Sequence, residues 1–141
     1  MSLPAALRPT VDVTRAAVVV TTYGAVTEPA RYDWTLSAGA TLSLPLTWMD
    51  GETAQAMDLG LGYTAVLTAR DTPTATPALT LTDADGLSLA SGSPNITVQR
   101  TAAQTTAYTG WLRVRYDLFV SRTGAETTHL LTGTVTRRDT V

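Results

Sequence analysis

The most constraining feature of the sequence is a strict alternation of apolar and polar residues across positions 41–48. Leu42, Leu44, Leu46 and Trp48 share one side of this segment, and Ser43, Pro45 and Thr47 share the other. A period of two is the signature of a half-buried β-strand, because successive side chains of a strand point to opposite faces. Pro45 has no amide hydrogen to donate to a ladder, so we expect this strand to lie at a sheet edge or to carry a bulge there.

Further segments repeat the same pattern. Residues 31–37 and 112–122 alternate in the same way, and residues 112–122 and 127–137, separated by a Thr-Gly-Ala-Glu turn, predict a hairpin. Shorter runs at residues 61–70, 78–82, 87–90 and 96–100 also predict strands. The predicted core consists of the apolar residues on the inward phase of these strands: Leu42, Leu44, Leu46, Trp48, Tyr63, Leu67, Val114, Tyr116, Leu118 and Val135.

One helical signal interrupts the strands. Thr101 and Gln104 have the spacing of a capping box, which predicts a short helix over residues 102–107. The chain also contains 28 threonines, a β-branched type that disfavours helix and suits a half-buried sheet. About eight strands at intervals of about 8–12 residues, with turns between them, predict an all-β fold. We expect an antiparallel β-sandwich, Ig-like or a flattened barrel, with one short helix and an N-terminal arm.

A length of 141 residues fits one domain. We expect residues 1–30 to form an N-terminal arm and residues 31–141 to form the sandwich, because Pro4, Pro9 and Pro29 interrupt regular pairing in the first part. The β-branched run Val18, Val19 and Val20 is suited to adding a strand to a sheet edge of another chain. The arm is therefore predicted to contribute little to its own fold and to contact neighbouring subunits.

Few residues offer chemistry. His129 is the single histidine and there is no cysteine, so the sequence supplies neither a thiolate nor a pair of imidazoles for a metal. The segment Asp83-Ala84-Asp85-Gly86 resembles the start of a calcium loop but lacks its further acidic ligands, and a tight turn accounts for it better. We therefore expect no enzymatic activity, no cofactor and no metal.

The charge and hydropathy of the chain bear on its partners. A formal charge of −2 and a pI near 5.2 argue against nucleic acid, which selects a basic face. No apolar run approaches the roughly 18 residues of a membrane span, and residues 1–15 lack the pattern of a signal peptide, so we expect synthesis in the cytoplasm.

All ten basic residues are arginines, whose planar guanidinium groups suit interfaces. Among the aromatic residues, Trp34 and Trp48 fall on the inward phase of their strands, whereas Trp111 follows a glycine and is a candidate contact residue. The residues predicted to form an assembly interface are Val18, Val19, Val20, Pro45 and Trp111.

A series of motifs from about residue 32 onward is similar to a known class of proteins. It comprises TLSLPLTWMDG at residues 41–51, Met-Asp-Leu-Gly at 57–60, the D-x-D-G turn, Thr-Ala-Ala-Gln-Thr at 101–105, and Tyr-Asp-Leu at 116–118 followed by G-x-x-T-x-x-L-L-x-G at 124–133. In order and spacing this resembles the small β-sandwich structural proteins of tailed bacteriophages, such as the N-terminal domain of baseplate upper proteins.

The resemblance implies a virion component of the tail, the baseplate or the fibre attachment. Its implied partners are other virion proteins, in a homo-oligomer or another symmetric assembly, and it implies no catalytic residue. Two alternatives stay open. One is a capsid decoration protein on the phage head, and the other is a carbohydrate-binding adhesion module that would hold a host glycan near Trp111.

Overall fold

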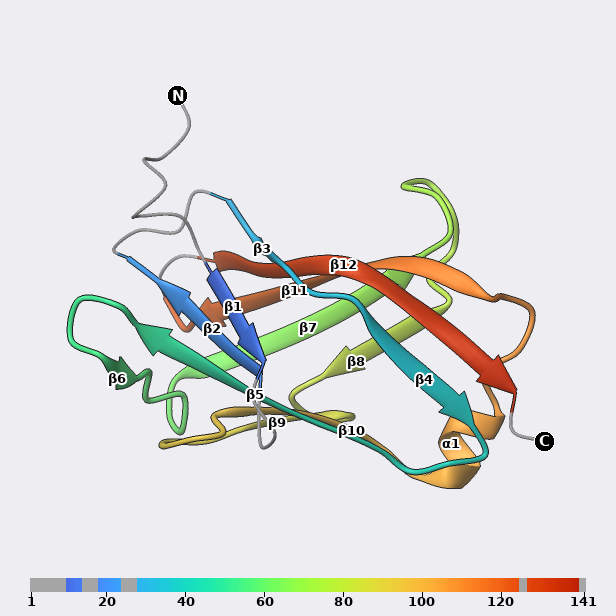
Figure 1. The fold of residues 1–141 in the computed structure, drawn as a ribbon, viewed down its shortest axis with the longest axis horizontal. Coiled ribbons are helices and arrows are strands. Elements are labelled where there is room, and N and C mark those ends of the chain that lie inside the picture. The colour runs from blue at the N-terminus through green and yellow to red at the C-terminus, as the bar shows by residue number, and fades with distance from the viewer. Residues whose placement is uncertain (1–9, 14–17, 24–27, 125–126, 140–141) are drawn as a thin grey trace.

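The computed structural model describes residues 10–13, 18–23, 28–124 and 127–139, which form two β-sheets and one short helix (Figure 1). The strands and the helix follow one another as β1 (Thr10–Val13), β2 (Val18–Thr22), β3 (Ala30–Arg31), β4 (Trp34–Ala38), β5 (Leu42–Asp50), β6 (Gln55–Ala56), β7 (Tyr63–Arg70), β8 (Leu79–Thr82), β9 (Leu87–Leu89), β10 (Ile96–Arg100), α1 (Ala102–Thr106), β11 (Arg113–Arg122) and β12 (Thr127–Asp139). The predicted all-β fold with one short helix is confirmed.

The strands divide into two sheets that pack face to face as a sandwich. Sheet A has the order β1-β2-β5-β10-β9, with β6 paired to one end of β5, and sheet B has the order β3-β12-β11-β7-β8, with β4 also paired to β12. The predicted hairpin of β11 and β12 is present and lies in the middle of sheet B.

Both sheets are mixed, whereas the sequence pattern predicts antiparallel pairing. Strand β2 runs parallel to β5, and β3 and β4 run parallel to β12. The parallel neighbours come from distant parts of the chain, so no local turn signal announces them. The strands β2, β3 and β4 thus pair with strands that lie further along the chain.

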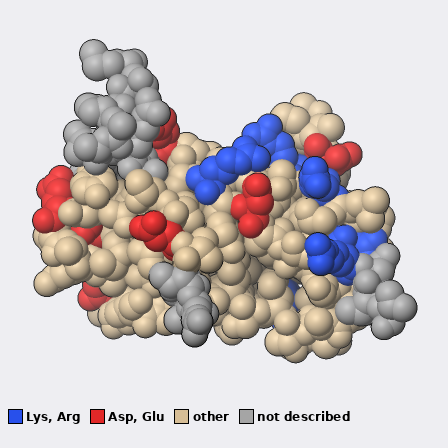
Figure 2. All heavy atoms as spheres, viewed as in Figure 1, with Lys and Arg blue, Asp and Glu red and all other residues tan. Residues whose placement is uncertain are grey.

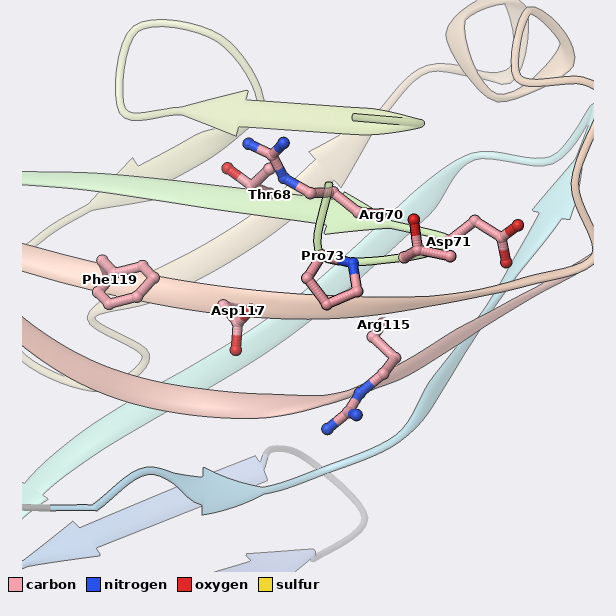
Figure 3. Close-up of a pocket in the computed structure, with 8 residues that line it drawn as sticks. Thr68, Arg70, Asp71, Pro73, Arg115, Asp117 and Phe119 are labelled. Carbon is pink, nitrogen blue, oxygen red and sulfur yellow. The ribbon is translucent and has the colours of Figure 1, made fainter. Parts of the chain in front are cut away.

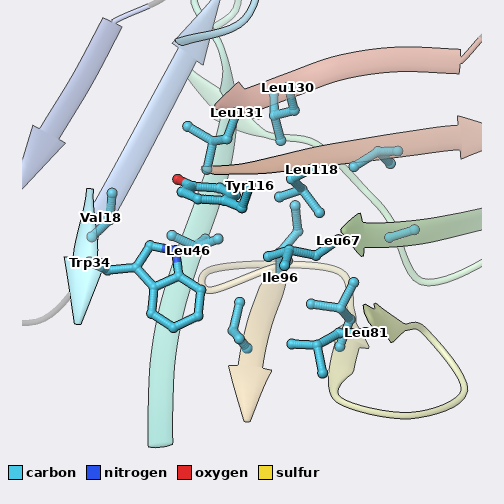
Figure 4. Close-up of a cluster of buried hydrophobic side chains, with 14 of the residues drawn as sticks. Val18, Trp34, Leu46, Leu67, Leu81, Ile96, Tyr116, Leu118, Leu130 and Leu131 are labelled. Carbon is cyan, nitrogen blue, oxygen red and sulfur yellow. The ribbon is translucent and has the colours of Figure 1, made fainter. Parts of the chain in front are cut away.

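The core lies between the two sheets and is filled by the inward side chains of both (Figure 4). Tyr116 of β11 is among its largest fully buried side chains, and it meets Trp34 of β4 edge to face, with ring centroids 5.9 Å apart. Edge-to-face packing of aromatic rings adds about 0.5–1.5 kcal/mol to the burial of their area. The β4–β11 contact therefore helps to hold the N-terminal strands on sheet B.

Most of the predicted core is buried. Leu46, Trp48, Leu67, Val114, Tyr116, Leu118 and Val135 are buried, and Leu42, Leu44 and Tyr63 are half-buried against the core. Leu112, at the start of the alternating segment 112–122, is 69% exposed because β11 begins only at Arg113.

Thr47 is buried although it lies on the outward phase of β5. The loop between β9 and β10 covers it, and the Thr47 and Ser93 hydroxyls lie 2.9 Å apart in a hydrogen bond. Asn95 from the same loop accepts a hydrogen bond from the Trp48 amide and donates to the carbonyls of Trp48 and Met57. The phase of the strand is as predicted, and a loop seals its outer side.

The prediction that the first 30 residues form an arm outside the sandwich is wrong for β2. Val18 and Val20 are buried in the core, and β2 lies between β1 and β5. The Trp48 indole nitrogen also donates to the Thr22 hydroxyl at 2.8 Å. A β-branched run is suited to any partner strand, and here the partner is β5 of the same chain. Residues 1–9, 14–17 and 24–27 of the predicted arm lie outside the described residues.

The short helix pins the crossing from sheet B to sheet A. The predicted capping box is present, with Thr101 and Gln104 bonded to each other's backbone amides. On the next turn the Thr105 hydroxyl accepts from the Gly39 amide and donates to the Ala40 carbonyl, at 3.1 and 2.8 Å. Helix α1 thereby fixes the loop through which the chain passes from β4 to β5.

Candidate assembly surfaces

The five residues predicted to form an interface lie in two separate places. Val18 and Val20 are core residues, so neither side chain offers a docking surface, while Val19 and Pro45 are half-buried. Pro45 lies opposite Thr97 of β10, and β5 is an inner strand of sheet A, although β2 pairs with it only from Leu46 onward. The prediction that this strand lies at a sheet edge is therefore wrong, although β10 is the partner strand at Pro45 itself and β2 begins to pair one residue later.

Trp111 lies on the segment that joins α1 to β11. Its ring packs partly against the core, and its carbonyl accepts a hydrogen bond from the Arg137 guanidinium at 2.7 Å. Together with Pro77, Thr109 and the exposed Leu112, it lines an open hollow of about 790 Å³. Since its side chain is partly buried against the core, Trp111 forms the wall of a hollow and not a free aromatic platform.

His129 lies in a hydrogen-bonded cluster on the outer face of sheet B. Its Nε2 is 2.8 Å from Oδ1 of Asp117, and the Thr132 hydroxyl donates to that same oxygen at 3.0 Å. A register shift in the hairpin between Leu118 and Phe119 sets Phe119 opposite His129, and the two rings stack 4.4 Å apart. In the structure His129 is thus part of a half-buried group.

This cluster lacks the order of a catalytic triad. In a triad the hydroxyl donates to the imidazole, which is oriented in turn by the carboxylate. Here the hydroxyl of Thr132 and the imidazole both bond the carboxylate of Asp117, so the carboxylate is the shared acceptor. The arrangement ties β11 to β12.

A group of arginines occupies the same outer face. Arg70 of β7 and Arg115 of β11 lie directly opposite each other in register, and Arg113 follows two residues before Arg115. We refer to Arg70, Arg113 and Arg115 as the arginine face. Like charges opposite each other destabilise a sheet, and Asp71 and Asp117 line the hollow beside this pair.

A hollow of about 460 Å³ opens beside these arginines (Figure 3). It is lined by Thr68, Arg70, Asp71, Thr72, Pro73, Arg115, Asp117 and Phe119. In the close-up the Arg70 and Arg115 side chains extend away from each other, and Pro73 lies between them. Asp117 and Phe119 lie along β11, the strand that carries Arg115. Arg70 donates to the Ala75 carbonyl at 2.9 Å, so one of the two guanidinium groups is held by the neighbouring loop.

The D-x-D-G segment forms the turn between β8 and β9, as the sequence predicted. Oδ1 of Asp83 accepts from the Ala65 amide, and Asp85 meets the buried Arg100 guanidinium through its carboxylate at 3.0 Å and its carbonyl at 2.8 Å. Both aspartates are thus used to fix the turn. Across the described ranges, no three His, Cys, Asp or Glu side chains cluster closely enough to hold a metal ion.

Tyr116 and Asp33 attach the β3–β4 segment to sheet B. The Tyr116 hydroxyl donates to the Tyr32 carbonyl, and burial, with a smaller contribution from the charge of Asp33, raises the pKa of this phenol well above its ordinary value. The Thr134 amide donates to Oδ1 of Asp33 at 2.8 Å, and this bond lowers the pKa of that carboxyl. Tyr116 was predicted only as a core residue. Its hydrogen-bond partner Tyr32 lies 84 residues away in the sequence and is brought near by the parallel pairing of β3 with β12.

Two further observations concern the whole chain. None of the described helical residues forms a helix of the length and apolarity that crossing a bilayer demands. The sequence matches no model of a known protein family and no curated protein.

Proposed function

We propose that this chain is a non-enzymatic structural protein of a bacteriophage virion, joining other proteins in the tail, the baseplate or the fibre attachment. The sandwich is the architecture that the resemblance to tail proteins implies. The observation that carries the proposal is the outer face of sheet B, which combines the arginine face with the stacked Phe119 and His129.

The composition of this face is that of a protein interface. Arginine and aromatic residues are enriched where proteins meet, and lysine is depleted there, as it is in this chain. Arginine also carries a large share of binding energy in such contacts, because its planar guanidinium bonds carboxylates in pairs. The hollow beside Phe119 gives a partner side chain a place to be buried.

The cluster around His129 supports a structural role over an enzymatic one. Its hydrogen bonds converge on Asp117 and tie two strands together. We therefore expect glutamine to replace His129 without loss of function, because its side-chain amide can still donate to Asp117 and keep the two strands tied.

A complementation experiment tests the proposal. The gene is disrupted in the phage, and the wild-type chain or the His129→Gln variant is supplied in trans. Both should restore intact, infectious particles, and immunogold labelling should then place the chain on the tail or on the head, which separates a tail component from a capsid decoration protein. Normal particles without the chain, or a chain that never associates with particles, would overturn the proposal.

A further inference from the structure

The charged residues are divided between the two sheets. Of the ten arginines, Arg8 and Arg15 lie outside the described residues, and seven of the other eight are on strands of sheet B: Arg31, Arg70, Arg113, Arg115, Arg122, Arg137 and Arg138. These strands carry two aspartates, Asp117 and Asp139, so their formal charge is 7 − 2 = +5. The eighth, Arg100 in sheet A, is buried and paired with Asp85.

Carboxylates gather at one end of sheet A. Asp50 ends β5, Glu52 lies in the turn that follows, and Asp58 comes two residues after β6. We call these three residues the acidic corner. Asp50 and Asp58 each cap a nearby backbone amide, and Glu52 and Asp58 are exposed. In Figure 2 most of the visible carboxylates lie toward the end that carries β6, whereas the middle and the opposite end carry the arginines together with further carboxylates.

We propose that copies of this chain associate head to tail, with the acidic corner of one copy docked on the arginine face of the next. This inference rests on the proposed function for its place in a particle, but it concerns a property of the isolated protein. Arg115 is exposed and forms no ion pair within the described ranges, so an incoming carboxylate would meet a guanidinium able to bond it bidentately.

Charge complementarity identifies a second copy as the occupant. The acidic corner belongs to sheet A and the arginine face to sheet B, so both surfaces stay available on every copy. A symmetric contact of arginine face with arginine face would set like charges against each other. A head-to-tail contact avoids this, and it builds a ring or a filament according to whether its rotation closes.

Sedimentation velocity tests the inference at two salt concentrations. The distance over which charges act falls from about 10 Å at 0.1 M salt to about 3 Å at 1 M. At the lower concentration the wild-type chain should form species larger than a dimer that grow with protein concentration, and at the higher concentration it should sediment as a monomer.

A pair of matched variants tests the geometry. Arg113→Gln with Arg115→Glu changes the arginine face by three charges, and Asp50→Asn with Glu52→Arg changes the acidic corner by three charges of opposite sign. Each variant alone should remain monomeric, whereas an equal mixture should form a species limited to a dimer, because one intact corner meets one intact face. Arg122→Glu, at the far end of β11, is the control and should assemble like the wild type.

The outcomes are separable from those of the complementation experiment. A wild-type chain that is monomeric at both salt concentrations overturns head-to-tail association but leaves the virion role standing, because the partner is then a different protein. A mixture that stays monomeric also overturns it, provided that each variant melts like the wild type. Assembly of the wild type together with dimers in the mixture supports it.

Discussion

Gly133 is the position at which a single added methyl group should disturb the fold most. A Cβ at this residue would lie 2.8 Å from Oδ1 of Asp33 and 2.9 Å from the carbonyl carbon of Tyr32, both closer than the 3.0 Å that real Cβ atoms keep. The Tyr32 backbone has little freedom to retreat. Its amide donates to the Thr132 carbonyl at 3.0 Å, and its carbonyl accepts from the Tyr116 hydroxyl.

Gly133→Ala should therefore push the β3–β4 segment off β12. Overpacking of this kind costs about 1–3 kcal/mol, and leaving a buried hydrogen-bonding group unpaired costs about 1–3 kcal/mol more. We expect a loss of about 3 kcal/mol in the free energy of unfolding and a fall of about 10 °C in Tm. Urea and thermal unfolding followed by circular dichroism measure both. Gly60→Ala is the control, because the nearest atom to its Cβ, Oδ1 of Asp58, would be 3.3 Å away.

A double-mutant cycle checks the cause. Tyr116→Phe alone removes the hydroxyl that bonds Tyr32, and it should cost about 1–2 kcal/mol. In the Gly133→Ala background the same change should cost much less, because the hydrogen bond is already broken. Additive losses, or a Gly133→Ala variant within about 0.5 kcal/mol of the wild type, would refute the reasoning.

Three more perturbations follow from the structure. Val20→Ala should lower the free energy of unfolding by about 2 kcal/mol in urea titrations, because β2 is part of the core. An unchanged urea midpoint of unfolding would show that β2 contributes nothing to the stability of the sandwich. Asn95→Ala leaves three backbone groups without their partner and should cost about 2–4 kcal/mol, with Ser91→Ala as a surface control. Because the pKa of Tyr116 is raised in the folded protein, its contribution to stability is complete below about pH 10 and is lost as the pH rises above that value. Tyr116→Phe should therefore flatten the alkaline fall in Tm. An identical fall in both proteins would contradict the assignment.

The local patterns of the sequence predicted the strands well. The alternation around Leu46 and Trp48, the hairpin of β11 and β12, and the capping box at Thr101 all act over a few residues and all appear in the structure. The parallel pairing of β2 with β5 escaped prediction, because a β-branched run carries no information about which strand it joins. Thr47 escaped for a similar reason, since the residues that cover it lie more than 40 positions away.

The candidate assembly surface could be predicted from the sequence less well than the fold could. The excess of arginine over lysine indicated an interface, but the arginine face requires the register that sets Arg70 opposite Arg115. The stack of His129 on Phe119 depends on the irregularity at Leu118, which neither strand announces in its sequence. Val18 and Val20, the residues that most resembled an edge strand, are the ones that the core requires.

The copy number of the chain in purified particles tests the virion role most directly. Particles are banded on a sucrose density gradient, washed repeatedly in about 0.1 M salt, at which the proposed charged contacts persist, and analysed by quantitative mass spectrometry. A structural component should be present in a fixed, whole-number ratio to the major particle proteins in every preparation. A chain that is absent, or whose ratio falls with each wash and varies between preparations, would contradict the account.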